Sequence, residues 1–374
     1  MIPPGTRILM TADAVGGVWQ YATDLARALA PAGVETVIAL MGPPPSAAQR
    51  ATAVAIPGVT LVDTGLELDW LAEDAGTVAD AGRGIAALAG DLKADIVQLS
   101  MPALAASVRF AMPVVAVAHS CVATWWDAMH GTVLPADFAW RGALVGAGLR
   151  AVDRVVAPSA AFAEAVMRVH RLARPPTVVH NGRAPIVLPS AAMHDFAFTA
   201  GRLWDKAKNV ATLDRAAARL AFPVKAAGPV RGPNGERASF ANLVAVGSMG
   251  EAGIAACLAA RPVFASAARY EPFGLAVLEA AAAGCPLVLS DIPTFRELWD
   301  GVAVFVPAED DRAFAEAIEA IVGDMHVRLM LGDAARARAA RYTLAAEAAG
   351  MMTIWRDLLR PNRAVHSAAP QVAA

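Results

Sequence analysis

The sequence predicts an α/β protein with two domains, each built on a mostly parallel sheet covered by helices. Short apolar strands alternate with helical stretches along the whole chain, a rhythm typical of parallel sheets. The chain has 374 residues, more than one core usually serves, so two domains are expected. The proline-punctuated segment TVVHNGRAPIVLP, at 177–189, interrupts the alternation and predicts a domain boundary near residue 185.

The first half opens with the strand Arg7 to Thr11, which runs through Asp13 to Gly16 and Gly17 and then into a helix, Val18 to Ala30. Strand, glycine turn and helix form the start of an α/β unit. After the strand at 114–118, the segment from Ser120 to Trp126 is predicted to be a loop. The other elements predicted in this half are strands at 36–41, 95–99, 114–118 and 154–157 and helices at 81–92 and 143–151.

The second half repeats this rhythm from Phe196 to the end of the chain. No repeat at solenoid period accompanies it. Strands are predicted at 196–200, 223–227, 243–246, 263–265, 286–290 and 303–306, and helices at 210–220, 313–322, 327–340 and 344–359, with a loose tail at 361–374.

The stretch RYEPFGLAVLEAAAAG, at 269–284, combines turn chemistry with a helix. Pro272 disfavours helix at Glu271, Gly274 permits a tight backbone, and good helix formers run from Leu275 until Gly284 can close the end. Glu271 is therefore expected in a loop at a helix N-terminus. The unpaired N–H groups of such a first turn suit the phosphates of a ligand.

Composition excludes several classes of function. A hydrophobic fraction of 56%, a charged fraction of 18% and a net charge of -2 leave no basic field for nucleic acid. Cys121, Cys257 and Cys285 lack zinc or disulfide spacing, which fits a reducing cytoplasm. No signal peptide is evident, and the apolar window Phe110 to Trp126 is too short for a membrane span. Peripheral membrane contact stays open.

Cations follow the predicted strand 196–200, in the segment GRLWDKAKN. Arg202, Lys206 and Lys208 would lie at the carboxyl edge of a parallel sheet, where open α/β folds bind ligands. A guanidinium fork and a movable ammonium suit a diphosphate. A solvated basic loop is an equal alternative for this segment taken alone, and Lys206 is the better surface candidate.

Three further features carry a functional and a structural interpretation each. Gly16 and Gly17 would let a backbone approach a ligand, or would form a plain turn, since they lack dinucleotide-fingerprint or P-loop spacing. His119 ends a strand and would point into the crevice, or is structural. In the structural interpretation Glu271 caps the helix and Glu279 is an exposed helix residue. In the functional interpretation both bind ligand hydroxyls. The second interpretation is favoured for Glu279, whose neighbours are apolar, because a lone buried carboxylate needs hydrogen-bond donors.

Taken together, the glycine turn, the histidine after a strand, GRLWDKAKN and EPFGLAVLE resemble the retaining GT-B glycosyltransferases of family 4, over nearly the whole chain and in the same order. The resemblance implies two Rossmann-like domains facing across a cleft, at 1–184 for the acceptor and 185–343 for the nucleotide-sugar donor. It also implies that a last helix, 344–360, crosses back to the first domain.

The resemblance also implies roles for individual residues. Arg202 and Lys208 would bind the donor diphosphate, and Glu279 the ribose hydroxyls. His119 would contact the transferred sugar. Glu271 and the backbone of Phe273, Gly274 and Leu275 would hold the transferred sugar and the distal phosphate. Gly16 and Gly17 would let the first domain's loop approach the phosphates or the acceptor.

The chemistry so implied is retaining transfer of a hexose from a UDP- or GDP-linked donor to a hydroxyl acceptor. Stabilising the departing diphosphate matters more here than a strong nucleophile. No Asp-any-Asp triplet occurs, so neither metal nor cofactor is expected. An inactive nucleotide-sugar-binding protein and a GT-B epimerase or phosphorylase remain alternatives. The sequence leaves open the donor sugar, the nucleotide base, the acceptor, the oligomeric state and the choice between Lys206 and Lys208. It also leaves open whether Trp125, Trp126 and Trp140 form an acceptor wall.

Overall fold

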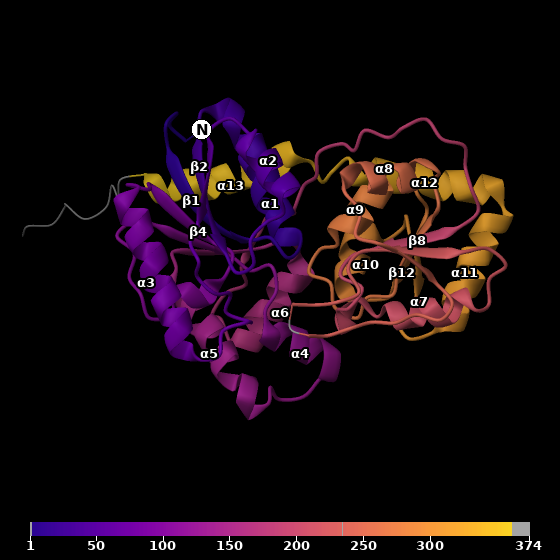
Figure 1. Cartoon of the computed structure of the whole chain (residues 1–374), viewed down its shortest axis with the longest axis horizontal. Helices are drawn as coiled ribbons and strands as arrows, with labels where there is room; N and C mark the ends of the chain where they lie inside the picture. The colour runs from indigo at the N-terminus through magenta and orange to yellow at the C-terminus, as the bar shows by residue number, and fades with distance from the viewer. Residues whose placement is uncertain (1, 234, 361–374) are drawn as a thin grey trace, which may run out of the picture.

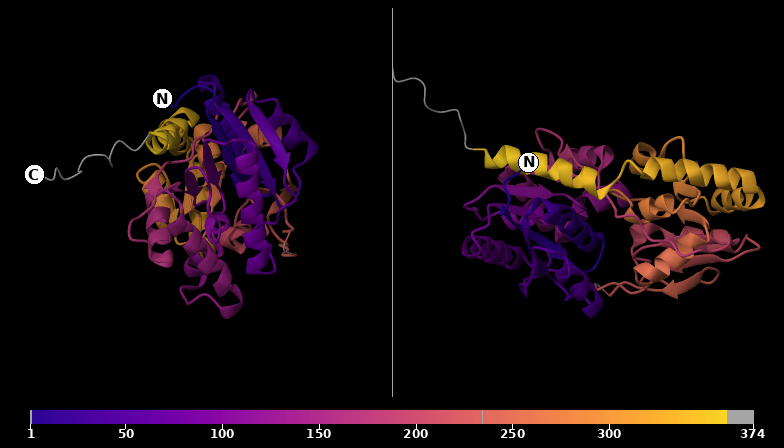
Figure 2. Two further views of the ribbon diagram at one scale, coloured as in Figure 1. Left: turned by 90° about the vertical axis from the view of Figure 1, so that its left-hand side faces the viewer. Right: turned by 90° about the horizontal axis from the view of Figure 1, so that it is seen from above.

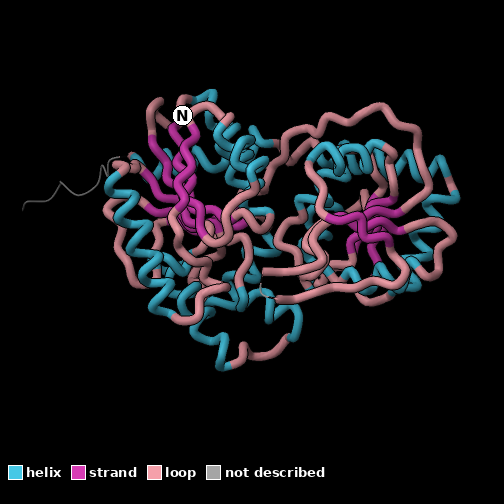
Figure 3. Tube along the Cα trace, viewed as in Figure 1, coloured by secondary structure: helices cyan, strands magenta, loops and turns pink. Residues whose placement is uncertain are grey.

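The computed structural model describes residues 2–233 and 235–360, which form two α/β lobes (Figure 1). The tail predicted at 361–374 lies outside the described residues. In each lobe the strands gather inside a layer of helices (Figure 3). The predicted fold class, two doubly wound α/β domains, is confirmed.

In the described residues, the first domain contains a sheet of seven parallel strands in the order β3-β2-β1-β4-β5-β6-β7. The strand order reverses between β1 and β4, which is the switch point of a doubly wound sheet. The strands are β1 (Arg7–Asp13), β2 (Glu35–Met41), β3 (Val59–Asp63), β4 (Ile96–Leu99), β5 (Val114–Val117), β6 (Arg154–Ala157) and β7 (Thr177–Val178).

Helices cover both faces of this sheet, so its central strands β4 and β5 are buried along their whole length. The helices are α1 (Gly17–Leu29), α2 (Ala47–Val54), α3 (Ala75–Asp91), α4 (Val122–His130), α5 (Ala136–Ala151) and α6 (Ala160–His170), with short 3-10 turns η1 (Ala30–Ala32) and η2 (Pro102–Ala105).

One local prediction is wrong: the segment from Ser120 to Trp126 is mostly helix α4 and not a loop. Its threonine and two tryptophans are weak helix formers, and the residue that caps it is unusual. Cys121 accepts a hydrogen bond from the backbone N–H of Thr124, in a position where Ser, Thr, Asp or Asn is the rule. The helix is stabilised by that cap and by packing against its neighbours α5 and α6.

In the described part of the second domain, six parallel strands follow the order β10-β9-β8-β11-β12-β13, with the switch point between β8 and β11. The strands are β8 (Ala197–Ala200), β9 (Val224–Ala227), β10 (Val244–Gly247), β11 (Val263–Ser266), β12 (Leu287–Ser290) and β13 (Val304–Val306). The helices are α7 (Val210–Ala217), α8 (Glu251–Ala259), α9 (Leu275–Ala282), α10 (Pro293–Trp299), α11 (Asp311–Gly323) and α12 (Met325–Ala339), with the 3-10 turn η3 (Lys206–Lys208).

Two chain segments join the domains. The first follows β7 and reaches β8, and the boundary predicted near residue 185 falls within it. The second leaves α12 and becomes α13 (Leu344–Leu359), which runs back over the first domain (Figure 2). Met351 and Trp355 of α13 are fully buried in the same apolar cluster as Leu25 of α1. The helix therefore belongs to the first domain's core, as the resemblance to GT-B glycosyltransferases implied.

Polar contacts also tie the domains together beside the two connections. Glu297 of α10 accepts hydrogen bonds from the backbone N–H groups of Ala160 and Ala161, at 2.8 and 2.7 Å, in the first turn of α6. A carboxylate at a helix N-terminus satisfies unpaired donors and the helix dipole. Ser159, just before that helix, donates to the Pro272 carbonyl at 2.7 Å. A helix of one domain is thus capped by the other.

No helix in the described ranges is both long and apolar enough to cross a bilayer.

Glu347 of α13 is an acidic residue buried at the junction of the two connections. Its Oε2 accepts a 2.7 Å hydrogen bond from the Gly182 backbone N–H. Burial raises the pKa of Glu347 to about 8, an effect that the Gly182 hydrogen bond only partly offsets. The side chain is therefore mainly protonated at neutral pH.

This buried carboxyl group makes the stability depend on pH. Its pKa is 4.5 as an ordinary glutamate, the value taken for the unfolded chain, and about 8 in the folded chain. Between pH 4.5 and 8 folding therefore takes up a proton, and the free energy of unfolding falls as the pH rises. We expect Glu347→Gln, which keeps an oxygen acceptor for Gly182, to flatten this fall in denaturant unfolding at a series of pH values. Glu319→Gln, at an exposed position of α11, should leave the wild-type slope. If the free energy of unfolding of Glu347→Gln depended on pH as it does in wild type, Glu347 would not be the source of the pH dependence.

Candidate active site

A cavity of about 870 Å³ lies between the two domains and is lined by both. The lining segments follow β1 and β5 in the first sheet and β8, β9 and β11 in the second. Ligands of doubly wound sheets bind outside the carboxyl ends of the strands at the switch point. Here β1 borders one switch point and β8 and β11 border the other, so the two binding edges face one another.

The glycine pair predicted to permit close approach lies against side chains of the second domain. A Cβ atom on Gly16 would lie 2.7 Å from Nη1 of Arg202, and one on Gly17 would lie 3.5 Å from the Leu275 side chain. Both neighbours belong to the second domain. Gly16 therefore makes room for a guanidinium group at the cavity wall.

Arg202 follows β8 and lines the cavity. Its Nη2 donates to Asp205 at 2.8 Å, and its guanidinium carbon lies 5.8 Å from the centre of the Trp204 ring. Burial alone would raise the pKa of Asp205, but the charges of Arg202 and Lys208 outweigh it and lower that pKa. The Nε atom of Arg202 is buried and has no hydrogen-bond partner among the described residues.

The two candidate lysines differ in depth. Lys208 forms an ion pair with Glu271, and the two side chains are 21% and 15% exposed. Lys206 is 70% exposed at the cavity rim, where it pairs with Glu236 at 3.1 Å. The deeper position, beside the carboxylate at the start of α9, belongs to Lys208.

The loop before α9 has the predicted form. Gly274 is in the left-handed region, with φ of 95°, and it begins a helix that continues to Ala282. Gly274 and Leu275 line the cavity, so the unpaired N–H groups of the first turn are close to it. Phe273 is 3% exposed, and its ring packs edge-on against Tyr342 at a centroid distance of 5.7 Å. Its aromatic side chain is an anchor for the loop.

His119 lines the cavity at the end of β5. Its ring packs edge-on against Tyr21 at 4.5 Å, and its buried Nε2 atom has no hydrogen-bond partner in the described part of the chain. Burial lowers the pKa of His119 to about 4. The imidazole is thus neutral at physiological pH and can exchange a hydrogen bond with a ligand without carrying a charge.

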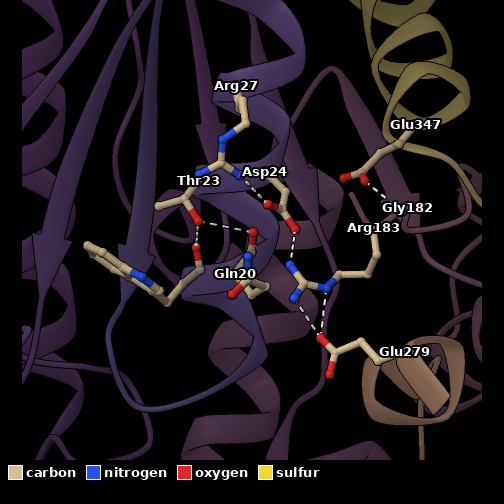
Figure 4. Close-up of polar contacts among 9 residues, drawn as sticks. Gln20, Thr23, Asp24, Arg27, Gly182, Arg183, Glu279 and Glu347 are labelled. Carbon is tan, nitrogen blue, oxygen red and sulfur yellow. Dashed lines mark hydrogen bonds and ion pairs between the residues drawn. The ribbon is translucent and has the colours of Figure 1, made fainter. Parts of the chain in front are cut away.

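Glu279 is not the lone buried carboxylate that the sequence suggested. Arg183, from the first connection, donates to its Oε1 from both Nε and Nη2 at 2.7 Å, and it also pairs with Asp24 of α1 (Figure 4). Burial raises the pKa of Glu279, and the charge of Arg183 opposes that shift. Glu279 still lines the cavity, so it is both paired and accessible to a ligand.

The sequence missed several residues of the cavity. Asp13, the last residue of β1, and Asp69 with Trp70 lie on the first-domain side. Burial raises the pKa of Asp69 to about 6, with the nearby charge of Asp13 acting in the same direction. The position of Asp13 at the end of a strand could have been recognised, whereas the segment of Asp69 has no motif. Asn181 also lines the cavity at 6% exposure, with its Oδ1 unpartnered in the described residues.

Among the three tryptophans for which an acceptor wall was left open, Trp125 lines the cavity in the described residues. Trp126 stacks on His130 at a centroid distance of 4.1 Å and Trp140 lies against Arg141 at 4.3 Å.

No group of three or more His, Cys, Asp or Glu side chains that could hold a metal ion occurs within 2–233 and 235–360.

The cavity has cationic side chains and a helix N-terminus on its second-domain side, and Asp13 and Asp69 on its first-domain side. Arg202, Lys208 and the start of α9 supply positive charge and N–H donors on the second-domain side. A double Rossmann-like architecture with its carboxyl edges facing in this way is the GT-B fold.

Comparison with known families identifies the chain more narrowly. The model described as Glycosyltransferase Family 4 matches residues 15–184, and the model described as Glycosyl transferases group 1 matches residues 194–324. Between them they cover most of both domains. The chain belongs to this family of glycosyltransferases.

Individual relatives are more distant. A segment of 113 residues is 34% identical to phosphatidyl-myo-inositol mannosyltransferase of Mycobacterium leprae, covering 29% of this chain and 30% of that protein. Sucrose-phosphate synthase from Thermosynechococcus elongatus shares the fold with a TM-score of 0.75 at 19% identity, over 94% of this chain and 99% of that one. HepE from Anabaena, solved with UDP-glucose, has a TM-score of 0.72 at 17% identity, over 94% and 100% of the two chains.

The space that Gly16 leaves for Arg202 can be tested directly. The nearest atom to an added Cβ is the end of a flexible side chain, so Gly16→Ala should displace the guanidinium and leave the fold intact. We expect turnover of the sugar donor to fall by about 10- to 100-fold, with unfolding free energy changed by less than about 0.5 kcal/mol.

Gly90→Ala is the matched control, because a Cβ there meets nothing within 4 Å. That variant should keep wild-type turnover. Full activity in Gly16→Ala would show that the position of Arg202 does not matter.

Proposed function

We propose that this enzyme is a retaining, metal-independent hexosyltransferase that moves a sugar from a nucleoside diphosphate to a hydroxyl acceptor. The observation that carries the proposal is the joint placement of Arg202, Lys208 and the N-terminus of α9 on one wall of the cavity between the domains. These groups fit a diphosphate leaving group.

The transfer step needs little covalent chemistry from the protein. The bond between the anomeric carbon and the diphosphate oxygen breaks, and its electron pair leaves with the diphosphate. The acceptor oxygen bonds to the anomeric carbon on the same face, and its proton passes to the leaving phosphate. Arg202, Lys208 and the helix amides stabilise the charge that develops on the leaving oxygen.

The ion pair between Lys208 and Glu271 gives both residues a role. A donor diphosphate would draw Lys208 toward its negative charge and free an oxygen of Glu271 for the hydroxyls of the transferred sugar. His119, neutral because of its lowered pKa, would hydrogen-bond the sugar from the opposite wall. The two residues would hold the sugar between the domains.

The acceptor would bind on the first-domain side, near Asp13 and Asp69. Carboxylates accept hydrogen bonds from hydroxyl groups, and Trp70 and Trp125 offer apolar faces in the same cavity. Trp faces suit the carbon-bound surface of a sugar ring. We propose a polyhydroxyl acceptor at this place.

The relatives support a nucleotide-linked hexose as donor. HepE from Anabaena binds UDP-glucose, and the Mycobacterium leprae relative is named as a mannosyltransferase. We therefore propose UDP or GDP as the carrier. Free Cys121, Cys257 and Cys285 suit a reducing compartment, and we propose the cytoplasm.

Two alternatives lead to different products. A non-catalytic nucleotide-sugar-binding protein would bind donor without consuming it. A GT-B epimerase or phosphorylase would release an isomerised nucleotide sugar or a sugar phosphate.

Removing either cation tests the donor diphosphate site. We expect Arg202→Ala and Lys208→Ala each to lower turnover of the sugar donor by about 10² or more, as loss of a single electrostatic donor does in other enzymes. Release of nucleoside diphosphate would be measured with the donor that binds. Lys206→Ala removes a cation only a few residues away, at the exposed rim, and should retain wild-type turnover. Equal activity in all three variants would refute the assignment.

Screening of nucleotide sugars tests the carrier. A ligand at about 100 times its dissociation constant adds about 2.7 kcal/mol to the free energy of unfolding, so a true donor raises the melting temperature by several degrees. We expect UDP- or GDP-sugars to produce this shift and ADP-sugars a smaller one. The Arg202→Ala variant is the control and should show a reduced shift. No response to any of the three would contradict the proposed donor class.

A further inference from the structure

Arg183 lies where the two chain connections between the domains meet. Its backbone N–H donates to the Tyr342 carbonyl at 3.3 Å, and its backbone pairs with Thr343, in the segment that leads into α13. The preceding Gly182 donates to Glu347 of α13. The first and the second connection are thus joined at this residue, and its backbone is held from both sides.

Its side chain links one domain to the other (Figure 4). Nη1 pairs with Oδ2 of Asp24 on α1, while Nε and Nη2 both donate to Oε1 of Glu279 on α9. The side chains are nearly enclosed, at 9% exposure for Arg183, 1% for Asp24 and 18% for Glu279. Arg27 balances the second oxygen of Asp24 at 2.8 Å.

The way Glu279 is held leaves half of its carboxylate available. Both donors of Arg183 converge on Oε1, and Oε2 accepts no hydrogen bond in the described residues. Figure 4 shows the second oxygen directed away from the guanidinium. Since Glu279 lines the cavity, Oε2 is the atom that a ligand's hydroxyl groups can reach.

Building on the proposed function, we propose that Arg183 is the positioning residue for Glu279, presenting Oε2 to the ribose hydroxyls of the nucleotide, and that Asp24 anchors Arg183 to the first domain. A carboxylate on a short helix would otherwise turn among rotamers. Two N–H groups of a planar guanidinium that converge on Oε1 restrict that motion. Ribose binding at the second domain thereby depends on a contact with the first.

The proposal predicts a specific loss of ribose recognition. Calorimetry would compare UDP with 2′-deoxy-UDP on wild type, with the corresponding GDP and ADP pairs run alongside. We expect wild type to prefer the ribonucleotide by about tenfold, as for a hydrogen bond to a charged group. Arg183→Met and Arg183→Lys should remove most of that preference while binding of the deoxynucleotide stays nearly unchanged.

Companion variants locate the effect. Glu279→Gln, which changes the proposed ligand group itself, should lose the same preference, and combining it with Arg183→Lys should add little. Asp24→Asn should cause a smaller, few-fold loss. Arg27→Met removes the other partner of Asp24 without touching Glu279, so it is the matched control and should behave as wild type.

The outcomes separate the inference from the proposed function. If no nucleoside diphosphate binds wild type, the proposed function fails. If ribose preference is lost in Glu279→Gln but kept in folded Arg183→Lys and Arg183→Met, the positioning role fails while the function stands. Arg183→Lys retains a charge beside the two carboxylates, so it tests the proposal even where Arg183→Met does not fold. Full preference in Asp24→Asn would refute the anchoring role.

Discussion

The buried ion-pair network of Asp24, Arg183 and Glu279 constrains how the two domains meet. Each charge would be costly to remove from water alone, and the cost is offset because the guanidinium bonds to both carboxylates and Arg27 pairs with Asp24. The network joins α1 of the first domain, the connecting segment and α9 of the second domain. The arrangement of the domains is therefore coupled to the chemistry of the cavity, since Glu279 belongs to both.

The same principle recurs around the cleft, where groups of one domain satisfy groups of the other. Glu297 caps α6 across the interface, and Thr124 exchanges a 2.8 Å hydrogen bond with Tyr270. Gly16 accommodates Arg202. Two doubly wound sheets can bring their carboxyl edges together only if the loops there form hydrogen bonds across the interface or lack side chains that would clash. Both arrangements occur here. The result is a cavity whose second-domain wall carries cations paired with carboxylates and whose first-domain wall carries Asp13, Asp69 and Arg141.

Much of the fold was predictable from pattern because its strands are apolar runs of parallel type and its helices are long enough to show periodicity. The failures have local causes. The edge strand β3 is only half-buried and lacks a continuous apolar run, and α4 has a cysteine cap and weak helix formers. For α2 a cue was present and overlooked, since Ser46 and Gln49 form a capping box. Helices α6, α8 and α10 were also not predicted.

By itself, the sequence determined the two-domain α/β class and brought Arg202, Lys208, Glu271 and the glycine turn to strand ends, because the carboxyl ends of parallel strands meet at one edge of a sheet. Only the tertiary structure decided that Lys208 lies deeper than Lys206 and that Glu279 is paired. The partners of Arg183 lie 159 and 96 residues away in the chain. No local pattern encodes such contacts, since they arise when independent domains dock and buried charges must find opposite charges.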